Sequence, residues 1–176
     1  MMAELDPGEP DRSERLPDGT AVTVRPIGPE DEPLLHDLAA HMSIEDLRLR
    51  FFAPVRGITR TLASRLTHLD PSRELALVAL KDGLTLGIAR FSADPDRARA
   101  EFAIAVRSDW HGRGVGHLLM NRLIEAARKL GIGELVGAVL RENRPMLDMC
   151  RALGFSLAPH PDEAALVRAR KPLVDG

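Results

Sequence analysis

The sequence predicts a single domain of the α/β (α+β) class, in which helices flank a central mixed, mostly antiparallel sheet. Two observations lead to this fold class. The chain has 176 residues, of which 44% are hydrophobic and 28% charged, a size and composition typical of one globular domain with a substantial core. Short apolar runs with strand character also alternate with longer segments whose apolar residues recur at helical spacing. The expected order is one strand, helices, three strands, one helix, one strand, one helix and two strands.

The chain begins with a segment that offers little to bury. Residues 1–15 are rich in proline, glycine and charge, so we expect a flexible N-terminal segment there and a single domain over residues 16–173. Asp18 and Gly19 then supply the turn of a short hairpin, and the β-branched residues that follow form a strand.

Three helices are expected before the main sheet. The first opens at Pro29, with two acidic residues at its positive end, and the second is capped by Ser43. The third covers residues 58–69. Phe51 and Phe52, which link the second helix to the third, are expected to fill the core between helices and sheet. A docking surface for a protein is the alternative role of these two rings.

Three consecutive strands follow, and the links between them are too short for crossover helices, so we expect them to pair antiparallel. They cover residues 74–80, 84–91 and 100–106. The rest of the chain alternates helices and strands. These elements are a helix over 114–130, a strand over 135–140, a helix over 145–153 and weaker strands over 155–157 and 164–167.

Composition excludes several classes of function. A net charge of -2, from 24 basic and 26 acidic residues, gives no basic field for nucleic acid or an anionic membrane surface. No apolar run approaches the roughly 18 residues of a membrane span. The N-terminus lacks a secretory signal, so we expect a cytoplasmic protein. With no Tyr, no phenol can act as acid, base or nucleophile, and the single Cys150 can form neither an internal disulfide nor a CxxC metal site.

One segment carries the clearest chemical signal. A strand leads into a loop with Gly112, Gly114 and Gly116 and then directly into a helix, which gathers unpaired backbone N–H groups at the positive helix end. Such a loop can bind a phosphate, because glycine lets the ligand approach the backbone. A tight turn that needs glycine for geometry alone is the alternative. No Lys follows as in a P-loop, and His117 stands where a dinucleotide fingerprint needs its last glycine.

The loop resembles the phosphate signature of the GNAT (Gcn5-related) N-acetyltransferase superfamily, (Gln/Arg)-x-x-Gly-x-(Gly/Ala). Residues 111–116 match it at both glycines, while His111 replaces the usual Gln or Arg. Residues 143–155 are similar to the second signature, Asn-x-x-Ala-x-x-Leu-Tyr-x-x-x-Gly-Phe, with Cys150 in the tyrosine position. The resemblance covers about residues 20–157. It implies the GNAT fold, whose sheet is splayed between its fourth and fifth strands, and acetyl-CoA as co-substrate.

Three stretches, residues 25–59, 73–80 and 100–120, resemble more narrowly the acetyltransferase domain of bacterial Pat-type protein lysine acetyltransferases. Those enzymes acetylate lysines of acyl-CoA synthetases and related proteins. The resemblance implies a protein substrate of this kind as a partner, alongside acetyl-CoA. No metal is expected, because His111 and His117 lack a third ligand at useful spacing.

By the same resemblance, the candidate site divides into coenzyme-binding and catalytic residues. The main-chain amides of the glycine loop hold the diphosphate, and the backbone of the strand before it meets the pantetheine arm. Asn143 lies near that arm, caps the next helix, or does both. The coenzyme-binding candidates are Ala105, Val106, Gly112, Arg113, Gly114, Val115, Gly116, His117 and Asn143.

Glu101 is the candidate general base, since it matches a glutamate that Pat-type enzymes use. A lysine ammonium of pKa about 10.4 must lose its proton, and a carboxylate of pKa about 4.3 becomes a better base when desolvation raises that pKa. The apolar residues 102–104 permit such desolvation. A solvated glutamate at a strand end is the alternative reading of Glu101, and Glu74 is a weaker candidate that would act through water. Cys150 fits a small buried hydrophobe better than an acid, so the thiolate of coenzyme A is expected to leave without a phenolic proton donor.

We therefore expect an acetyl-CoA-dependent N-acetyltransferase that transfers acetyl directly to a protein lysine in a ternary complex. Two alternatives stay open. One is a GNAT enzyme that acts on a small amine. The other is a non-catalytic acyl-CoA-binding module, which would need the glycine loop but not Glu101.

Overall fold

In a computed structural model, which describes residues 11–53 and 55–174, the chain forms one eight-stranded sheet in the order β1-β2-β3-β4-β5-β6-β8-β7. Neighbouring strands run antiparallel, except for the parallel pair β5 and β6. The strands are β1 Arg12–Arg15, β2 Ala21–Pro26, β3 Glu74–Lys81, β4 Leu84–Ala93, β5 Arg99–Val106, β6 Glu134–Leu140, β7 Ser156–Pro159 and β8 Leu166–Pro172. The mixed, mostly antiparallel sheet expected from the sequence is thereby confirmed.

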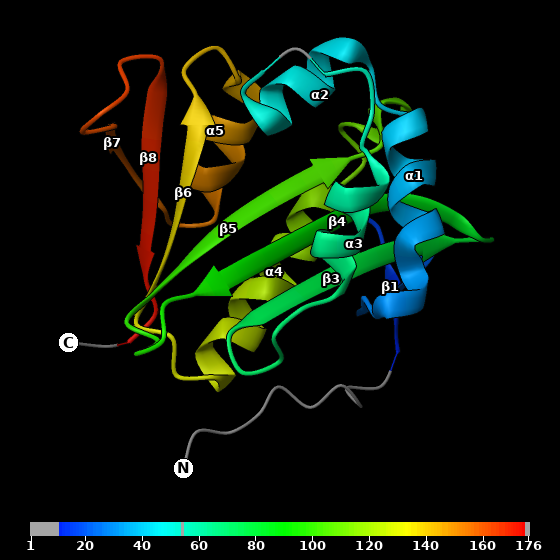
Figure 1. Cartoon of the computed structure of the whole chain (residues 1–176), viewed down its shortest axis with the longest axis horizontal. Helices are drawn as coiled ribbons and strands as arrows, with labels where there is room; N and C mark the ends of the chain where they lie inside the picture. Colours follow the sequence, from blue (N-terminus) through cyan, green and yellow to red (C-terminus); the bar gives the residue numbers. More distant parts are fainter. Residues whose placement is uncertain (1–10, 54, 175–176) are drawn as a thin grey trace.

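Helices cover both faces of this sheet (Figure 1). The longest, α4, packs on one face over the larger hydrophobic core, while α1 and α3 pack on the other face over a smaller one. The helices are η1 Pro29–Asp31, α1 Glu32–Ala40, α2 Ile44–Phe51, α3 Arg60–Thr67, η2 Ser108–Trp110, α4 Val115–Lys129 and α5 Arg144–Ala152. The order of helices and strands predicted over residues 16–173 agrees with the structure.

The N-terminal boundary differs from the expectation. Strand β1 lies inside the segment predicted to be flexible, and it pairs antiparallel with β2 to complete the hairpin. Two ion pairs hold it against α4: the closest nitrogen and oxygen atoms are 3.4 Å apart between Arg12 and Glu125 and 2.5 Å apart between Glu14 and Arg122. Because polar contacts rather than alternating apolar residues hold this edge strand, its composition gave no strand signal. Residues 1–10 lie outside the described residues.

Two details near α2 also differ. The third helix is shorter than the predicted 58–69, because Thr59 caps it by accepting a hydrogen bond from the backbone N–H of Leu62. Phe52 does not fill the core: it ends α2 in a left-handed conformation, with φ of 62°, and its side chain is 46% exposed. Phe51, within the helix, is half-buried.

The feature that positions the site is the short parallel contact between β5 and β6. The two strands pair only at Arg99↔Glu134, Ala100↔Leu135 and Glu101↔Val136, and beyond these pairs they diverge. Figure 1 shows them close together at one end and separating toward α2. Phe102 packs where they part: it is buried, and a Cβ added at Gly137 of β6 would lie 2.6 Å from its ring. This is the splay expected between the fourth and fifth predicted strands.

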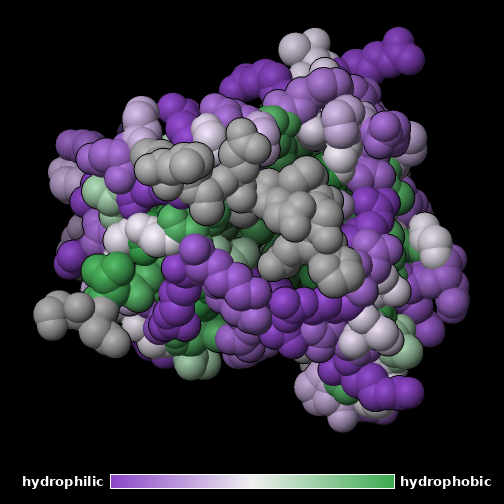
Figure 2. All heavy atoms as spheres, turned by 90° about the horizontal axis from the view of Figure 1, so that it is seen from below, coloured by the Kyte–Doolittle hydropathy of each residue, from purple (hydrophilic) through white to green (hydrophobic). Residues whose placement is uncertain are grey.

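The end of the molecule away from this opening has a mixed surface. Figure 2 shows that hydrophilic residues dominate there and that hydrophobic residues appear in separate patches between them. Within the described ranges, none of the helices combines the length and apolar character required to cross a membrane.

Candidate active site

A groove of about 1310 Å³ opens where β5 and β6 separate. Its walls come from β5 and the loop after it, the start of α4, the end of β6, α5, and α2 together with the β1–β2 turn. The candidate base Glu101 and all coenzyme-binding candidates named from the sequence line this groove, whereas Glu74, the weaker candidate base, does not. The candidates that line it are Glu101, Ala105, Val106, Gly112, Arg113, Gly114, Val115, Gly116, His117 and Asn143. The structure thus brings together residues that are up to 42 positions apart, from Glu101 to Asn143.

Two glycines of the loop have backbone conformations that side chains rarely adopt. Gly112 and Gly114 have φ of 74° and 94°. At Gly114 an added Cβ would also lie 2.7 Å from Cδ of Pro17 in the β1–β2 turn. Gly116 has ordinary φ, but a Cβ there would lie 3.1 Å from Sδ of Met149 on α5. The loop therefore needs glycine for its own geometry, and the same absence of side chains leaves its backbone accessible from the groove.

The start of α4 supplies the hydrogen-bond donors. Gly114 is the N-cap, and the first helical hydrogen bond runs from the N–H of Leu118 to the carbonyl oxygen of Gly114, at 3.0 Å. The N–H groups of Val115, Gly116 and His117 therefore have no acceptor within the helix. With the positive end of a 15-residue helix behind them, these donors can bind a phosphate group that enters the groove.

The side chain of Arg113 contacts the β1–β2 turn, a contact that the sequence did not indicate. Its guanidinium stacks 3.7 Å from the ring centroid of Trp110, and Nη2 donates to Oδ2 of Asp18 at 3.1 Å. Hydrogen bonds from Thr20 and then Arg113 lower the pKa of Asp18 from 3.8 to about 2, so this pair is ionised at neutral pH. The side chain lines the groove, but part of its charge is balanced by Asp18.

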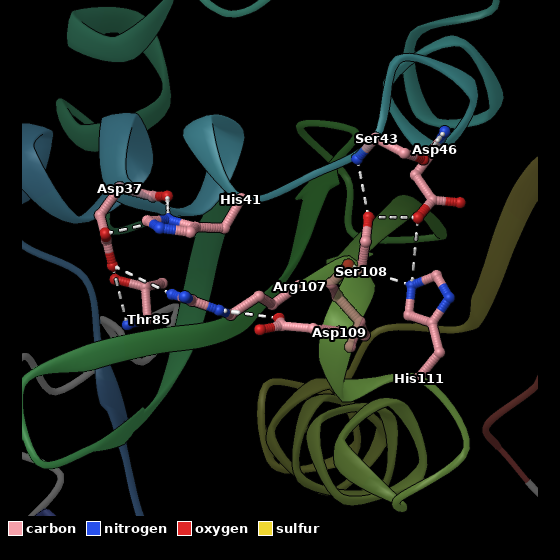
Figure 3. A network of polar contacts seen from close by, with 10 residues as sticks. Asp37, His41, Ser43, Asp46, Thr85, Arg107, Ser108, Asp109 and His111 are labelled. Atoms are coloured by element: carbon pink, nitrogen blue, oxygen red, sulfur yellow. Dashed lines mark hydrogen bonds and ion pairs between the residues drawn. The ribbon is translucent and has the colours of Figure 1, made fainter.

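Helix α2 is tied to the loop that follows β5 (Figure 3). The hydroxyl of Ser108 accepts a hydrogen bond from the backbone N–H of Ser43 at 2.7 Å and donates one to Asp46. Nε2 of His111 lies 3.6 Å from Oδ2 of Asp46 and 3.2 Å from the carbonyl oxygen of Val106. His111, at the first position of the phosphate signature, thus turns toward α2.

Two further sets of contacts fix the helices around the groove. Figure 3 shows Arg107, a buried residue, between Asp37 of α1 and Asp109, with Nε donating to Asp109 at 2.9 Å. On the far side of the splay, Arg48 of α2 pairs with Glu142, in the turn after β6, at 2.9 Å. Helix α2 therefore bridges the ends of both diverging strands. The sequence indicated the cap of this helix, but no local signal in the sequence points to its partners 60 or more residues away.

The face of the sheet opposite α4 carries the candidate base. Strand alternation and register place Glu74, Arg90 and Glu101 on this face, and Nη2 of Arg90 lies 3.6 Å from Oε2 of Glu74. Glu101 lines the groove and is exposed. The apolar surroundings expected from residues 102–104 are largely absent, because Phe102 and Ile104 point to the opposite face and pack in the core under α4.

Asn143 and Cys150 have clear structural roles. Oδ1 of Asn143 accepts a hydrogen bond from the backbone N–H of Met146 at 3.4 Å and so caps α5, while the residue also lines the groove. Cys150 is fully buried in the larger core and does not line the groove. Burial raises the pKa of its thiol from 9.0 to about 11. The position that holds a tyrosine in the family signature therefore offers no acid to the groove.

Residues 11–53 and 55–174 contain no group of three or more His, Cys, Asp or Glu side chains that could hold a metal ion. The chemistry available in the groove comes from backbone donors and from charged or titratable side chains. These are the carboxylates of Asp18, Asp46, Glu101 and Asp148, the imidazoles of His111 and His117, and the guanidinium groups of Arg15, Arg50 and Arg113.

Comparison with known proteins agrees with this geometry. The chain matches the Acetyltransferase (GNAT) family over residues 41–155. Acetyltransferase PA5475 of Pseudomonas aeruginosa is 31% identical over 158 residues, which cover 88% of this chain and 85% of that protein. The L-amino acid N-acyltransferase MnaT of Escherichia coli is 34% identical over 83 residues, 45% of this chain and 48% of that protein.

A solved structure extends the similarity over most of the fold. The GNAT domain of S. lividans PAT superposes with a TM-score of 0.87 at 27% identity, over 93% of this chain and 97% of that chain. The family match over residues 41–155 includes the glycine loop and the splay described above. The chain therefore belongs to the GNAT acetyltransferase family, whose enzymes use acetyl-CoA as co-substrate.

Proposed function

We propose that this enzyme transfers the acetyl group of acetyl-CoA to the ε-amine of a protein lysine, with Glu101 as general base. The observation that carries the proposal is the position of Glu101: its exposed carboxylate lines the groove at the last paired residue before β5 and β6 diverge. A long, extended side chain entering from a protein surface can reach such a carboxylate. An acyl-CoA synthetase is the substrate class that the resemblance to Pat-type enzymes suggests.

The co-substrate is proposed to lie along the open edge of β5. Beyond Glu101 this edge has no strand partner, so backbone groups at Ala105 and Val106 can pair with the pantetheine amides. The N–H groups of Val115, Gly116 and His117 hold the diphosphate. The amide nitrogen of Asn143, whose oxygen caps α5, is a further donor to the groove.

Transfer requires one bond to form and one to break. The lysine nitrogen, once neutral, attacks the thioester carbonyl carbon, a C–N bond forms, the C–S bond breaks and coenzyme A leaves as the thiolate. Glu101 accepts the proton that the ammonium loses, directly or through water. Because Cys150 is buried away from the groove, the thiolate leaves without a cysteine or phenolic acid.

The surface around the groove suits a protein acceptor. Phe52, exposed and at the groove, and Ile44, 67% exposed on the same helix, offer apolar contacts to residues around the acceptor lysine. Phe52 was expected to fill the core. Because its side chain is exposed instead, we assign it the alternative role, contact with a docked protein. We also propose that residues 16–173 act as one catalytic domain.

A small amine is the second candidate acceptor. The observation that favours it is the 34% identity to MnaT, an amino acid N-acyltransferase, over 83 residues. A module that only binds acyl-CoA is the weaker alternative, because it gives no role to a carboxylate in the groove.

The test is acetyl transfer from labelled acetyl-CoA to a purified acyl-CoA synthetase and to its lysine peptides. Wild type should label lysine, Glu101→Gln should lose most of the rate with its affinity for acetyl-CoA retained, and Glu163→Gln is the matched control. Glu163 is also exposed but lies outside the groove. Binding of acetyl-CoA without transfer to any lysine would exclude the proposal, and transfer to small amines alone would establish the second candidate.

A further inference from the structure

We propose that Arg50 binds a carboxylate of the acceptor close to the acceptor amine, so that the enzyme prefers lysines flanked by acidic residues. This inference rests on the proposed function and specifies its substrate class. It concerns the acceptor side of the groove, where no residue of the coenzyme signatures lies.

Arg50 stands between two adjoining spaces. It belongs to the last turn of α2 and lines both the groove and a small cavity of about 50 Å³ between α1–α3 and the sheet. Ala103, Ala105 and Met42 also line both spaces, so the cavity opens from the groove at this point. The walls of the cavity are otherwise mainly apolar, with Arg90 as the second cation. An acceptor group that enters here from the groove meets the guanidinium of Arg50.

Among residues 11–53 and 55–174, no carboxylate lies within 4.0 Å of the guanidinium of Arg50, and Glu101 acts on it only from farther away. Its one specific contact is with the ring of Phe51, 4.7 Å from Cζ to the centroid. Arg48, two residues earlier on the same helix, pairs with both Glu45 and Glu142. Burial lowers the pKa of Arg50 to about 10, which still leaves it charged at neutral pH. A half-buried cation without a partner is unfavourable, and a bound carboxylate removes that cost.

The surrounding charges also favour an anion. Arg90 and Glu101 act electrostatically on Arg50, Arg65 acts on Arg90, and Glu74 is paired with Arg90. Three guanidinium groups therefore face two carboxylates. A lysine ammonium alone would add a positive charge to this excess, whereas an acceptor with a neighbouring carboxylate brings the compensating charge. A guanidinium can also hold a carboxylate through two parallel hydrogen bonds, which fixes its orientation.

Coenzyme phosphates do not account for Arg50. Ala103 and Ala105, beside it, face away from α4, whereas the glycine loop and its free N–H groups belong to the start of α4 on the other side of the sheet. The acceptor and the coenzyme thus approach β5 from opposite faces, and Arg50 lies on the acceptor face.

The test compares two synthetic peptides that differ only beside the lysine, Glu-Lys-Glu against Gln-Lys-Gln, as acceptors for the 176-residue chain. We expect kcat/KM of wild type to favour the acidic peptide by at least about tenfold, because charge-assisted hydrogen bonds contribute more than the 1.4 kcal/mol that a tenfold ratio represents. Arg50→Gln should lose this ratio, and Arg50→Lys should keep part of it. Arg128→Gln, an exposed arginine outside the groove, should leave it unchanged.

The outcomes separate this inference from the proposed function. Equal rates on the two peptides, a ratio that persists in Arg50→Gln, or a loss of acetyl-CoA affinity in that variant would overturn the role of Arg50 while lysine transfer still stands. If neither peptide is acetylated although acetyl-CoA binds, the proposed function fails, and L-leucine against L-leucinamide decides the role of Arg50. A preference for leucine that Arg50→Gln abolishes would support carboxylate binding by Arg50, and equal rates would overturn it.

Discussion

Comparing Ala substitutions at Gly112 and Gly114 tests why the glycine loop needs glycine at these two positions. Gly112 and Gly114 have similar φ, 74° and 94°. An added Cβ at Gly112 would meet nothing within 4 Å, whereas at Gly114 it would lie 2.7 Å from Cδ of Pro17. Gly112→Ala therefore adds only backbone strain, about 1–2 kcal/mol for an L residue in this conformation.

Gly114→Ala adds a steric conflict to the same strain. The Pro17 ring is stiff, so the hairpin or the start of α4 must shift, which costs about 1–3 kcal/mol as overpacking. We expect Gly114→Ala to lower the free energy of unfolding by about 2–5 kcal/mol in total. In a domain of this size each kcal/mol lowers the melting temperature by roughly 2–4 °C.

Urea unfolding of the two variants measures the difference, and Pro17→Ala supplies the internal check. This change removes the ring carbons that the new methyl group would meet, so the double variant Pro17→Ala/Gly114→Ala should recover most of the difference between the glycine variants. Equal losses for Gly112→Ala and Gly114→Ala, or no recovery in the double variant, would refute the reasoning from the Pro17 contact.

Three further predictions concern single side chains. Asn143→Ala should lower the free energy of unfolding by about 1 kcal/mol through loss of the α5 cap. Asn143→Asp keeps the capping oxygen and should be as stable as wild type. Equal stability of Asn143→Ala and wild type in urea would contradict the cap. Cys150, whose pKa burial raises to about 11, should react with a thiol reagent at pH 8 only as fast as the protein opens, and Cys150→Ala should retain acetyl transfer; rapid labelling of native protein would contradict this. The Asp18 carboxylate, with pKa lowered to about 2, contributes stability that is present above about pH 4, close to its ordinary pKa, and is lost as pH falls toward 2. The stability difference between wild type and Asp18→Asn should therefore shrink over that range, and a difference independent of pH would argue against the Asp18–Thr20–Arg113 contacts.

The sequence predicted well those features that depend on local pattern. The order of elements follows from hydrophobic period, and the caps at Ser43 and Asn143 follow from residue type. The glycine loop was predicted at the start of α4 because it needs only neighbours in the chain. These features are encoded within a few residues, so a single sequence contains them.

Features that depend on distant partners could not be predicted in this way. Strand β1 is held by ion pairs to α4, more than 100 residues away, and its own composition is that of a mobile segment. The apolar surroundings expected for Glu101 are largely absent because side chains alternate between the two faces of a strand. Phe102 and Ile104 point to the face opposite that of Glu101 and pack in the core under α4. Arg113 remains a coenzyme-binding candidate, but its contact with Asp18, in a turn 95 residues earlier, could not be predicted from neighbouring residues.

The brevity of the β5–β6 contact has a thermodynamic consequence for ligand binding. The backbone edge of β5 is parted from β6 by packed core residues, Phe102 against Gly137, and by the bridging helix α2, so no strand pairing has to be broken when acetyl-CoA arrives. The free-energy cost of keeping the two strands apart is part of the folding free energy. It therefore does not lower the association constant for acetyl-CoA. The coenzyme site that we propose along β5 is therefore preorganised, because the backbone edge that would pair with the pantetheine amides is already open in the folded protein.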